Sequence, residues 1–166
     1  MQIRRLAPAD ALSYRALRLR ALLEHPDAFT SSWEDDREQP VEAAAARLDS
    51  HAFWGAFQGA ELYGFVGLER EPRAKNRHKA TVVGMYVAPE IAGQGVGRSL
   101  LAALLAHARS AGLGSLVLTV TEGNAQAQRL YQSAGFHSFG VEPDAIRVDG
   151  RSYSKNHMQM DLGTAP

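Results

Sequence analysis

The sequence predicts a mixed α/β fold, in which a mostly antiparallel central sheet contains one parallel strand pair and is flanked by helices. Three observations predict it: an early hairpin pattern, a central strand–glycine loop–helix–strand–helix succession, and a second hairpin pattern near the end of the chain. Because strand, helix and strand in succession nearly always form a right-handed crossover, the two central strands should be parallel.

The N-terminal part predicts a strand at residues 2–5 and then an amphipathic helix. The apolar residues of that helix recur at spacings of four, three and four and form the expected buried stripe: Leu12, Ala16, Leu19 and Leu23. Most arginines fall off this stripe: Arg15, Arg18 and Arg20. Pro8 suits the first turn of the helix and Pro26 ends it.

The next elements follow from turn residues and periodicity. Residues 28–39 show neither period and are expected to form a loop or ragged helix, and the alanines at 43–46 a short helix. A Gly59 turn between two apolar segments predicts an antiparallel hairpin. The expected strands are 51–57, 61–70, 81–87, 115–120, 137–142 and 151–162, and the expected later helices are 96–111 and 124–134. Asp149-Gly150 predicts the second hairpin turn.

Composition limits the class of protein. The 166 residues, of 18.0 kDa, match one ordinary domain, so residues 1–166 are expected to fold as a single unit. Cysteine is absent, which excludes a disulfide framework, a Cys-ligated metal and a Cys nucleophile. The six histidines form no HxH or HExxH pair, so we expect no metal site.

The charge balance favours neither nucleic acid nor a membrane as a partner, because 18 Lys and Arg residues match 18 Asp and Glu residues. The longest apolar run in a helical pattern, 100–106, is far shorter than the roughly 20 residues that span a bilayer. No apolar segment follows Arg4 and Arg5, so the start does not resemble a secretory signal. We therefore expect a cytoplasmic protein.

Three glycines, Gly93, Gly95 and Gly97, alternate just before the helix at 96–111. Glycine permits positive φ, and a helix start supplies unpaired N–H donors and partial positive charge, so a pyrophosphate would fit. A plain turn is an alternative. A P-loop would need lysine where Arg98 stands, and a dinucleotide loop would need GxGxxG spacing, although Glu122 could serve as its ribose-binding acid.

A second motif begins at Asn124, about 27 residues after Gly97, and reads Asn-x-x-Ala-x-x-Leu-Tyr-x-x-x-Gly-Phe. Together with the glycine loop it resembles the signature of the GCN5-related N-acetyltransferase (GNAT) superfamily, and the motif-rich match covers residues 81–136. The family's loop usually begins with Gln or Arg, whereas Ala92 stands here. That change removes a side chain but leaves the backbone donors.

The resemblance implies acetyl-CoA as cofactor and a parallel strand pair that splays apart. Gly84 marks either a bulge that opens this pair or a position where a side chain would not pack. It places the pyrophosphate on the loop and helix start, which comprise Gln94, Gly95, Val96, Gly97, Arg98 and Ser99. It pairs the pantetheine arm with the strand end formed by Met85, Tyr86 and Val87. Asn124 is either the N-cap of its helix or a contact to the cofactor.

Tyr131 is the expected catalytic residue, since the family's tyrosine at this position protonates the departing thiolate; spacing alone would make it a core aromatic. The sequence does not assign a general base for the amine, and the candidates are Glu34, Glu69 and Glu122. The N–H of Val87 is expected to hold the thioester oxygen. The expected acceptor pocket uses residues 28–39 and the C-terminal strands. Its candidate aromatic walls are Phe29, Trp33 and Trp54, with a core position as the more usual alternative for each.

The predicted function is therefore direct transfer of an acetyl group from acetyl-CoA to a primary amine within a ternary complex. The acceptor is a small-molecule or peptide amine of unspecified identity, and a homodimer is a family-level expectation. One alternative is a non-catalytic acyl-CoA-binding sensor module. A nicotinamide-dinucleotide protein is a third and weaker one.

Overall fold

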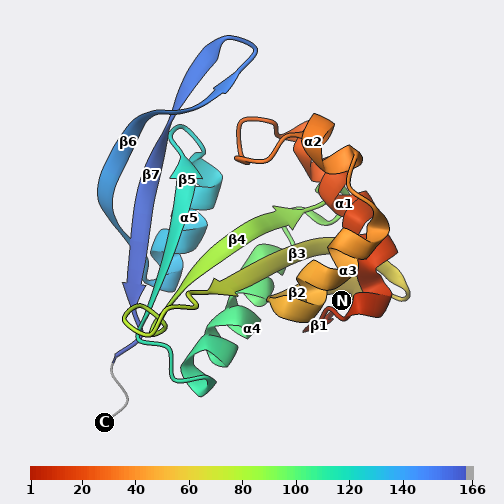
Figure 1. Ribbon diagram of the computed structural model, residues 1–166, viewed down its shortest axis with the longest axis horizontal. Coiled ribbons are helices and arrows are strands. Elements are labelled where there is room, and N and C mark those ends of the chain that lie inside the picture. The colour runs from red at the N-terminus through yellow and green to blue at the C-terminus, as the bar shows by residue number, and fades with distance from the viewer. Residues whose placement is uncertain (164–166) are drawn as a thin grey trace.

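The computed structural model describes residues 1–163, which form one seven-stranded sheet of order β1-β2-β3-β4-β5-β7-β6 (Figure 1). The strands are β1 Gln2–Arg5, β2 Ala52–Gln58, β3 Glu61–Arg70, β4 Lys79–Val87, β5 Ser115–Thr121, β6 His137–Val148 and β7 Arg151–Asp161. Every neighbouring pair is antiparallel except β4 and β5. The predicted mixed sheet with one parallel pair is confirmed.

Helices cover both faces of the sheet (Figure 1). They are α1 Ala11–Glu24, α2 Trp33–Arg37, α3 Val41–Ser50, α4 Val96–Ser110 and α5 Ala125–Ala134. One apolar core joins α4 and α5 to the sheet, and a second lies between the opposite face and helices α1 and α3. The alanine helix is longer than predicted, and β6 continues to Val148 because the Asp149-Gly150 turn carries both hairpin strands outward.

The buried face of α1 differs from the predicted stripe. Leu12 is 73% exposed and Leu23 is 58% exposed. The residues that pack inward are Ala11, Tyr14, Leu17, Arg18, Ala21 and Leu22. Both stripes have helical spacing, and contact with Phe53 and Phe65 selects the one that contains the large aromatic ring of Tyr14. A charged residue, Arg18, is thereby carried into the interior.

The parallel strands β4 and β5 pair only at their beginnings, from Lys79 opposite Ser115 to Thr81 opposite Val117. Beyond this point they separate, as Figure 1 shows. Gly84 has φ +64°, and the register with β3 shifts there, so β4 bulges and bends away from its parallel neighbour. The predicted splay and bulge are both present.

The loop between α1 and α2 bridges the open side of this gap. The Thr121 hydroxyl of β5 donates a hydrogen bond to the Asp27 carbonyl at 2.6 Å, and the Lys155 ammonium of β7 donates to the Thr30 hydroxyl at 3.3 Å. Both Thr121 and Lys155 are buried. The two halves of the sheet are therefore linked across the gap by this loop.

Replacing Gly84 with alanine should lower the free energy of unfolding by about 1–3 kcal/mol, because positive φ disfavours L side chains and strain adds to this. The new Cβ would also lie 3.3 Å from Phe65 Cε2. Urea unfolding measures the change. Gly59→Ala, with φ +59° and no neighbour within 4 Å, is the control for backbone strain alone. Equal losses in both variants would contradict a packed bulge.

Across residues 1–163, no helix has the length and apolar character needed to cross a membrane.

Candidate functional site

The loop between β4 and α4 presents backbone rather than side chains. Gly93 and Gly95 have φ of +77° and +75°, and a Cβ at either would meet nothing within 4 Å. Gly95 is the N-cap of α4, and within the described chain no side chain caps this helix. The first backbone N–H to bond back to the loop is that of Ser99, which donates to the Gly95 carbonyl at 3.0 Å.

The N–H groups of Val96, Gly97 and Arg98 are consequently the orphan donors of the first helical turn. Gln94, Gly95 and Arg98 are exposed, whereas Val96 points its side chain into the core. The Arg98 side chain forms no hydrogen bond or ion pair with residues 1–163. An oxyanion placed here would meet several N–H donors, the positive end of the helix dipole and one free guanidinium.

Three motif segments meet at Gly97. A Cβ at this position would lie 3.4 Å from Leu130 Cδ2 of α5 and 3.9 Å from Val87 Cγ2 at the end of β4. The strand end, the glycine loop and the α5 motif are therefore neighbours, as the sequence analysis required.

The open edge of β4 is defined by its pairing with β3. The Ala88 N–H donates to the Tyr63 carbonyl at 2.7 Å, so the preceding peptide groups of Val87 face the opposite edge, toward the gap between β4 and β5. Met85 lies in the bulge beside Gly84 and packs its side chain against the core under α4. Val87 thus offers unpaired backbone groups inside the gap.

Tyr86 lies differently from its two neighbours. It is paired with Phe65 of β3, and its side chain is buried on the α1 face, where the hydroxyl donates to the Glu24 carboxylate at 2.5 Å. Burial, and then this carboxylate, raise the pKa of Tyr86. The Tyr86 side chain therefore ties β4 to α1 and does not enter the gap.

Tyr131 lies on α5, 6% exposed, with its ring 5.8 Å edge-on from the ring of Phe136. Its hydroxyl has no hydrogen bond to residues 1–163, yet it is not among the fully enclosed polar atoms that lack a partner there. It therefore retains contact with solvent. Burial raises the pKa of Tyr131, so the phenol stays protonated well above neutral pH.

Two further predicted residues bond within their own helix starts, and one of them is a cap. The Asn124 side chain accepts a hydrogen bond from the Ala127 N–H at 3.2 Å and is the N-cap of α5. Ser99 is exposed in the first turn of α4, where its hydroxyl donates to the Gly95 carbonyl at 3.2 Å. Asn124 thus has the first of its two expected roles.

The three aromatic side chains considered for the acceptor pocket lie in different parts of the molecule. Trp54 is buried on the α4 face, 5.2 Å from the His107 ring, so of its two alternatives, pocket wall or core aromatic, it has the core position. Phe29 packs against the core under α1, and Trp33 lies beneath the Arg37 guanidinium. Alternating strand residues point to opposite faces, and the sequence alone did not fix which face Trp54 takes.

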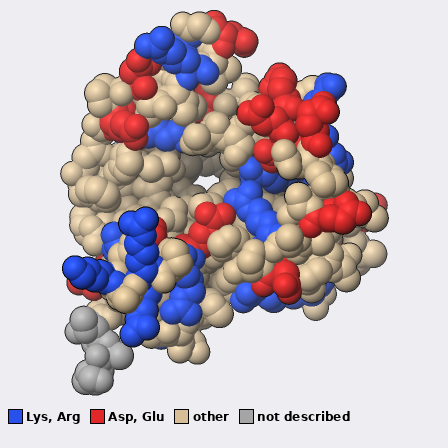
Figure 2. Space-filling model, in the orientation of Figure 1, with Lys and Arg blue, Asp and Glu red and all other residues tan. Residues whose placement is uncertain are grey.

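The three candidate glutamates do not include a well-placed general base. Glu34 and Glu122 are exposed, and the Glu69 carboxylate accepts a hydrogen bond from Arg47 at 2.9 Å. Figure 2 shows the molecule hollowed near the middle of this face, with both basic and acidic groups around the opening.

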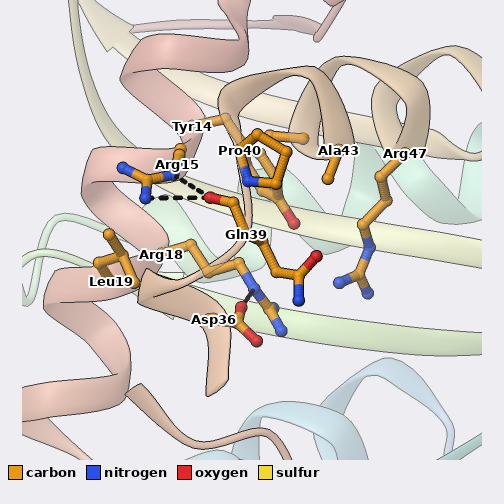
Figure 3. A pocket seen from close by; sticks show the side chains of 10 residues that line it. Tyr14, Arg15, Arg18, Leu19, Asp36, Gln39, Pro40, Ala43 and Arg47 are labelled. Atoms are coloured by element: carbon orange, nitrogen blue, oxygen red, sulfur yellow. Dashed lines mark hydrogen bonds and ion pairs between the residues drawn. The ribbon is translucent and has the colours of Figure 1, made fainter. Parts of the chain in front are cut away.

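The sequence analysis missed a group of polar side chains between α1, α2 and α3, comprising Tyr14, Arg18, Asp36 and Arg47 (Figure 3). Arg18 lies inside the buried, helically spaced face of α1. A charged residue within such a face is the signal that would have revealed the group, once the correct face was chosen.

Comparison with known proteins places these features in context. The sequence profile of the acetyltransferase (GNAT) family matches residues 19–136. An aminoglycoside N(6')-acetyltransferase type 1 from Stenotrophomonas maltophilia is 31% identical over 138 residues, which cover 81% of this chain and 84% of that protein. A mycothiol acetyltransferase from Thermobispora bispora is 35% identical over 137 residues, covering 80% of this chain. This chain spans about half of that relative, 45% of its length.

Solved structures share the fold. An acetyltransferase of the GNAT family from Streptococcus pneumoniae has a TM-score of 0.89 at 24% identity, covering 97% of this chain and 99% of that one. The yncA protein of Salmonella typhimurium, a putative acetyltransferase solved with its cofactor acetyl-CoA, has a TM-score of 0.88 at 24% identity, covering 100% and 96% of the two chains.

Proposed function

Because this chain belongs to the acetyltransferase (GNAT) family, we propose that it transfers an acetyl group from acetyl-CoA directly to a primary amine in a ternary complex. The observation that carries the proposal is the uncapped start of α4, which adjoins the point where β4 and β5 separate. A diphosphate needs the first feature, and an amide-bearing arm needs the open strand edge of the second.

The residues present fit this cofactor. In the proposal, Gln94, Gly95, Val96, Gly97 and Arg98 hold the diphosphate through backbone N–H groups and one guanidinium. Val87 and Met85 supply the strand edge for the arm, Asn124 caps the start of α5, and the Ser99 hydroxyl donates to the Gly95 carbonyl in the first turn of α4. Tyr86 contributes by fixing β4 to α1 rather than by direct contact. Acetyl-CoA supplies the activated acetyl group as a thioester.

The residues of this chain have two roles in the proposed transfer, which are to hold the carbonyl oxygen and to donate a proton. The Val87 N–H holds the thioester carbonyl oxygen as negative charge develops there. When the amine nitrogen bonds to the carbonyl carbon, the carbon–sulfur bond breaks and its electron pair leaves with sulfur. The Tyr131 hydroxyl donates a proton to that sulfur, and the proton shed by the amine nitrogen restores the phenol through solvent. No covalent enzyme intermediate forms.

A panel of small-molecule and peptide amines, each mixed with acetyl-CoA and the protein, tests this function by following release of the free thiol. We expect release with at least one amine and a matching acetylated product by mass spectrometry. Binding of coenzyme A without release from any amine would favour the sensor module instead. Binding of a nicotinamide dinucleotide but not of coenzyme A would contradict both readings.

A further inference from the structure

A cavity of about 140 Å³ lies between α1, α2 and α3, on the face of the sheet opposite α4. Figure 3 shows that the Tyr14 hydroxyl, the Gln39 amide and the guanidinium groups of Arg18 and Arg47 are directed toward one another across it. These four side chains come from α1, α3 and the loop after α2, so the tertiary fold alone brings them together.

Two residues that line this cavity each have a polar atom that is fully buried without a hydrogen-bond partner among residues 1–163: Tyr14 Oη and Arg47 Nε. Tyr14 is only 1% exposed, and its ring is held edge-on by Phe53 at 5.3 Å and Phe65 at 5.2 Å. The ring therefore cannot turn its hydroxyl to solvent. An unpaired buried donor costs about 1–3 kcal/mol, so it calls for an explanation.

Arg18 is a third source of unused donors. Its Nε donates to Asp36 Oδ2 at 2.5 Å and its Nη2 donates to the Ser31 hydroxyl at 3.1 Å. No bond from Nη1 to residues 1–163 is present. The guanidinium is therefore fixed in place by the α1–α2 loop and α2, with one nitrogen left over.

The charges around the cavity favour an anion. Its lining includes three arginines, at positions 15, 18 and 47, and one carboxylate, that of Asp36. Glu69 reaches Arg47 through one Nη group only. Burial raises the pKa of Tyr14 while Arg47 and Arg18 oppose that rise, and the phenol is a neutral donor at physiological pH. The two enclosed atoms left without a partner, Tyr14 Oη and Arg47 Nε, can both donate, and a carboxylate is acceptor-only.

One residue that lines the cavity, Arg18, also lies close to the bulge of β4. Arg18 Nη1 would lie 4.0 Å from a Cβ at position 84, in the bulge of β4 that precedes Val87. The loop that holds Arg18 through Ser31 also carries Thr30, which bonds to Lys155 across the gap between β4 and β5. The cavity is thus linked to β4 through Arg18 and to the far side of the gap through the α1–α2 loop.

We propose that this cavity binds a carboxylate carried by the amine acceptor, so that the acceptor is a free amino acid or a short peptide rather than a simple amine. This inference rests on the proposed acetyltransferase function. The Tyr14 hydroxyl, Arg18 Nη1 and Arg47 Nε are the donors to the carboxylate. Asp36 and Glu69 hold the two guanidinium groups and are positioning residues.

Equilibrium binding tests the subsite without requiring turnover. The probes are N-acetyl amino acids and N-acetyl dipeptides, each as free acid and as carboxamide, titrated into the protein with coenzyme A by isothermal titration calorimetry. At least one free acid should bind about tenfold or more tightly than its carboxamide, as expected for hydrogen bonds to a charged group. Which of the two sets binds distinguishes amino acid from peptide.

Tyr14→Phe separates a binding role from a structural one. It removes the unpaired hydroxyl and keeps the ring, so Tm should stay level or rise, while affinity for the free acid falls about tenfold and affinity for coenzyme A is unchanged. Tyr63→Phe, which removes an exposed hydroxyl bonded to Glu61, should alter neither affinity. Arg47→Gln should weaken free-acid binding in the same way.

Equal binding of acids and carboxamides, no binding by any acid, or unaltered acid affinity in Tyr14→Phe would each overturn the subsite. Acid-selective binding lost in Tyr14→Phe would support it even if no amine were acetylated. In that case the proposed transfer would fail while the carboxylate subsite stood. Conversely, rapid acetylation of amines with no preference for a carboxylate would uphold the transfer and reject the subsite.

Discussion

Replacing Tyr131 with phenylalanine should lower kcat by about a hundredfold, the low end of what a positioned general acid contributes. The hydroxyl has no partner among residues 1–163 and the ring packs on Phe136, so the substitution removes a proton donor and leaves the core filled. The dissociation constant of acetyl-CoA should change little. Initial rates of thiol release and calorimetric titration of coenzyme A measure the two quantities.

The pH dependence gives an independent check on this role. The active form is the protonated phenol, and burial raises its pKa above the ordinary value near 10, so its proton is retained across pH 7–10. No fall in kcat below pH 10 should arise from Tyr131. Tyr63→Phe, which removes an exposed hydroxyl bonded to Glu61, is the control and should have normal turnover. Full activity in Tyr131→Phe would remove the proton-donor role.

Replacing Arg98 with glutamate should raise the KM for acetyl-CoA about ten- to a hundredfold, because a guanidinium contact to the diphosphate becomes a repulsion. Position 98 lies in the first turn of α4, where a carboxylate interacts well with the helix dipole. Stability should therefore be kept or gain about 0.3–1 kcal/mol. Weaker acetyl-CoA binding with unchanged or higher stability would show that the loss of binding does not come from unfolding.

Arg98→Gln is the matched variant, since it removes the charge without reversing it. Its KM for acetyl-CoA should lie between that of the unsubstituted protein and that of Arg98→Glu. The difference between the variants should shrink as salt is added, because exposed charges are screened. Urea unfolding supplies the stability values. If Arg98→Glu bound acetyl-CoA as tightly as the original chain, the diphosphate could not lie on this helix start.

Much of the fold could be predicted because its cues are local. The alternating glycines and the apolar helix after them fixed the start of α4, and the Asp149-Gly150 turn fixed the second hairpin. The α5 motif placed Asn124 at a helix start, where the structure has it as N-cap. The sequence also indicated the splay of β4 and β5, although only through the resemblance to a known family.

Other features required the folded chain. The stripe chosen for α1 was wrong because Leu12 and Tyr14 both belong to helically spaced sets, and only the partner surface of Phe53 and Phe65 decides between them. The pattern of strand β2 likewise left open whether Trp54 walls a pocket or packs in the core, and only the fold places it in the core under α4. Periodicity identifies an amphipathic element but does not identify what packs against it.

The sequence by itself determined the order of the elements, the glycine-rich helix start and the motif that carries Tyr131, because each depends on residues close together along the chain. Only the tertiary structure decided that Tyr14, Arg18 and Arg47 converge on one cavity. Their convergence depends on the angles at which α1 and α3 cross the sheet. Those angles are set by side-chain packing summed over many distant residues, which no short segment encodes.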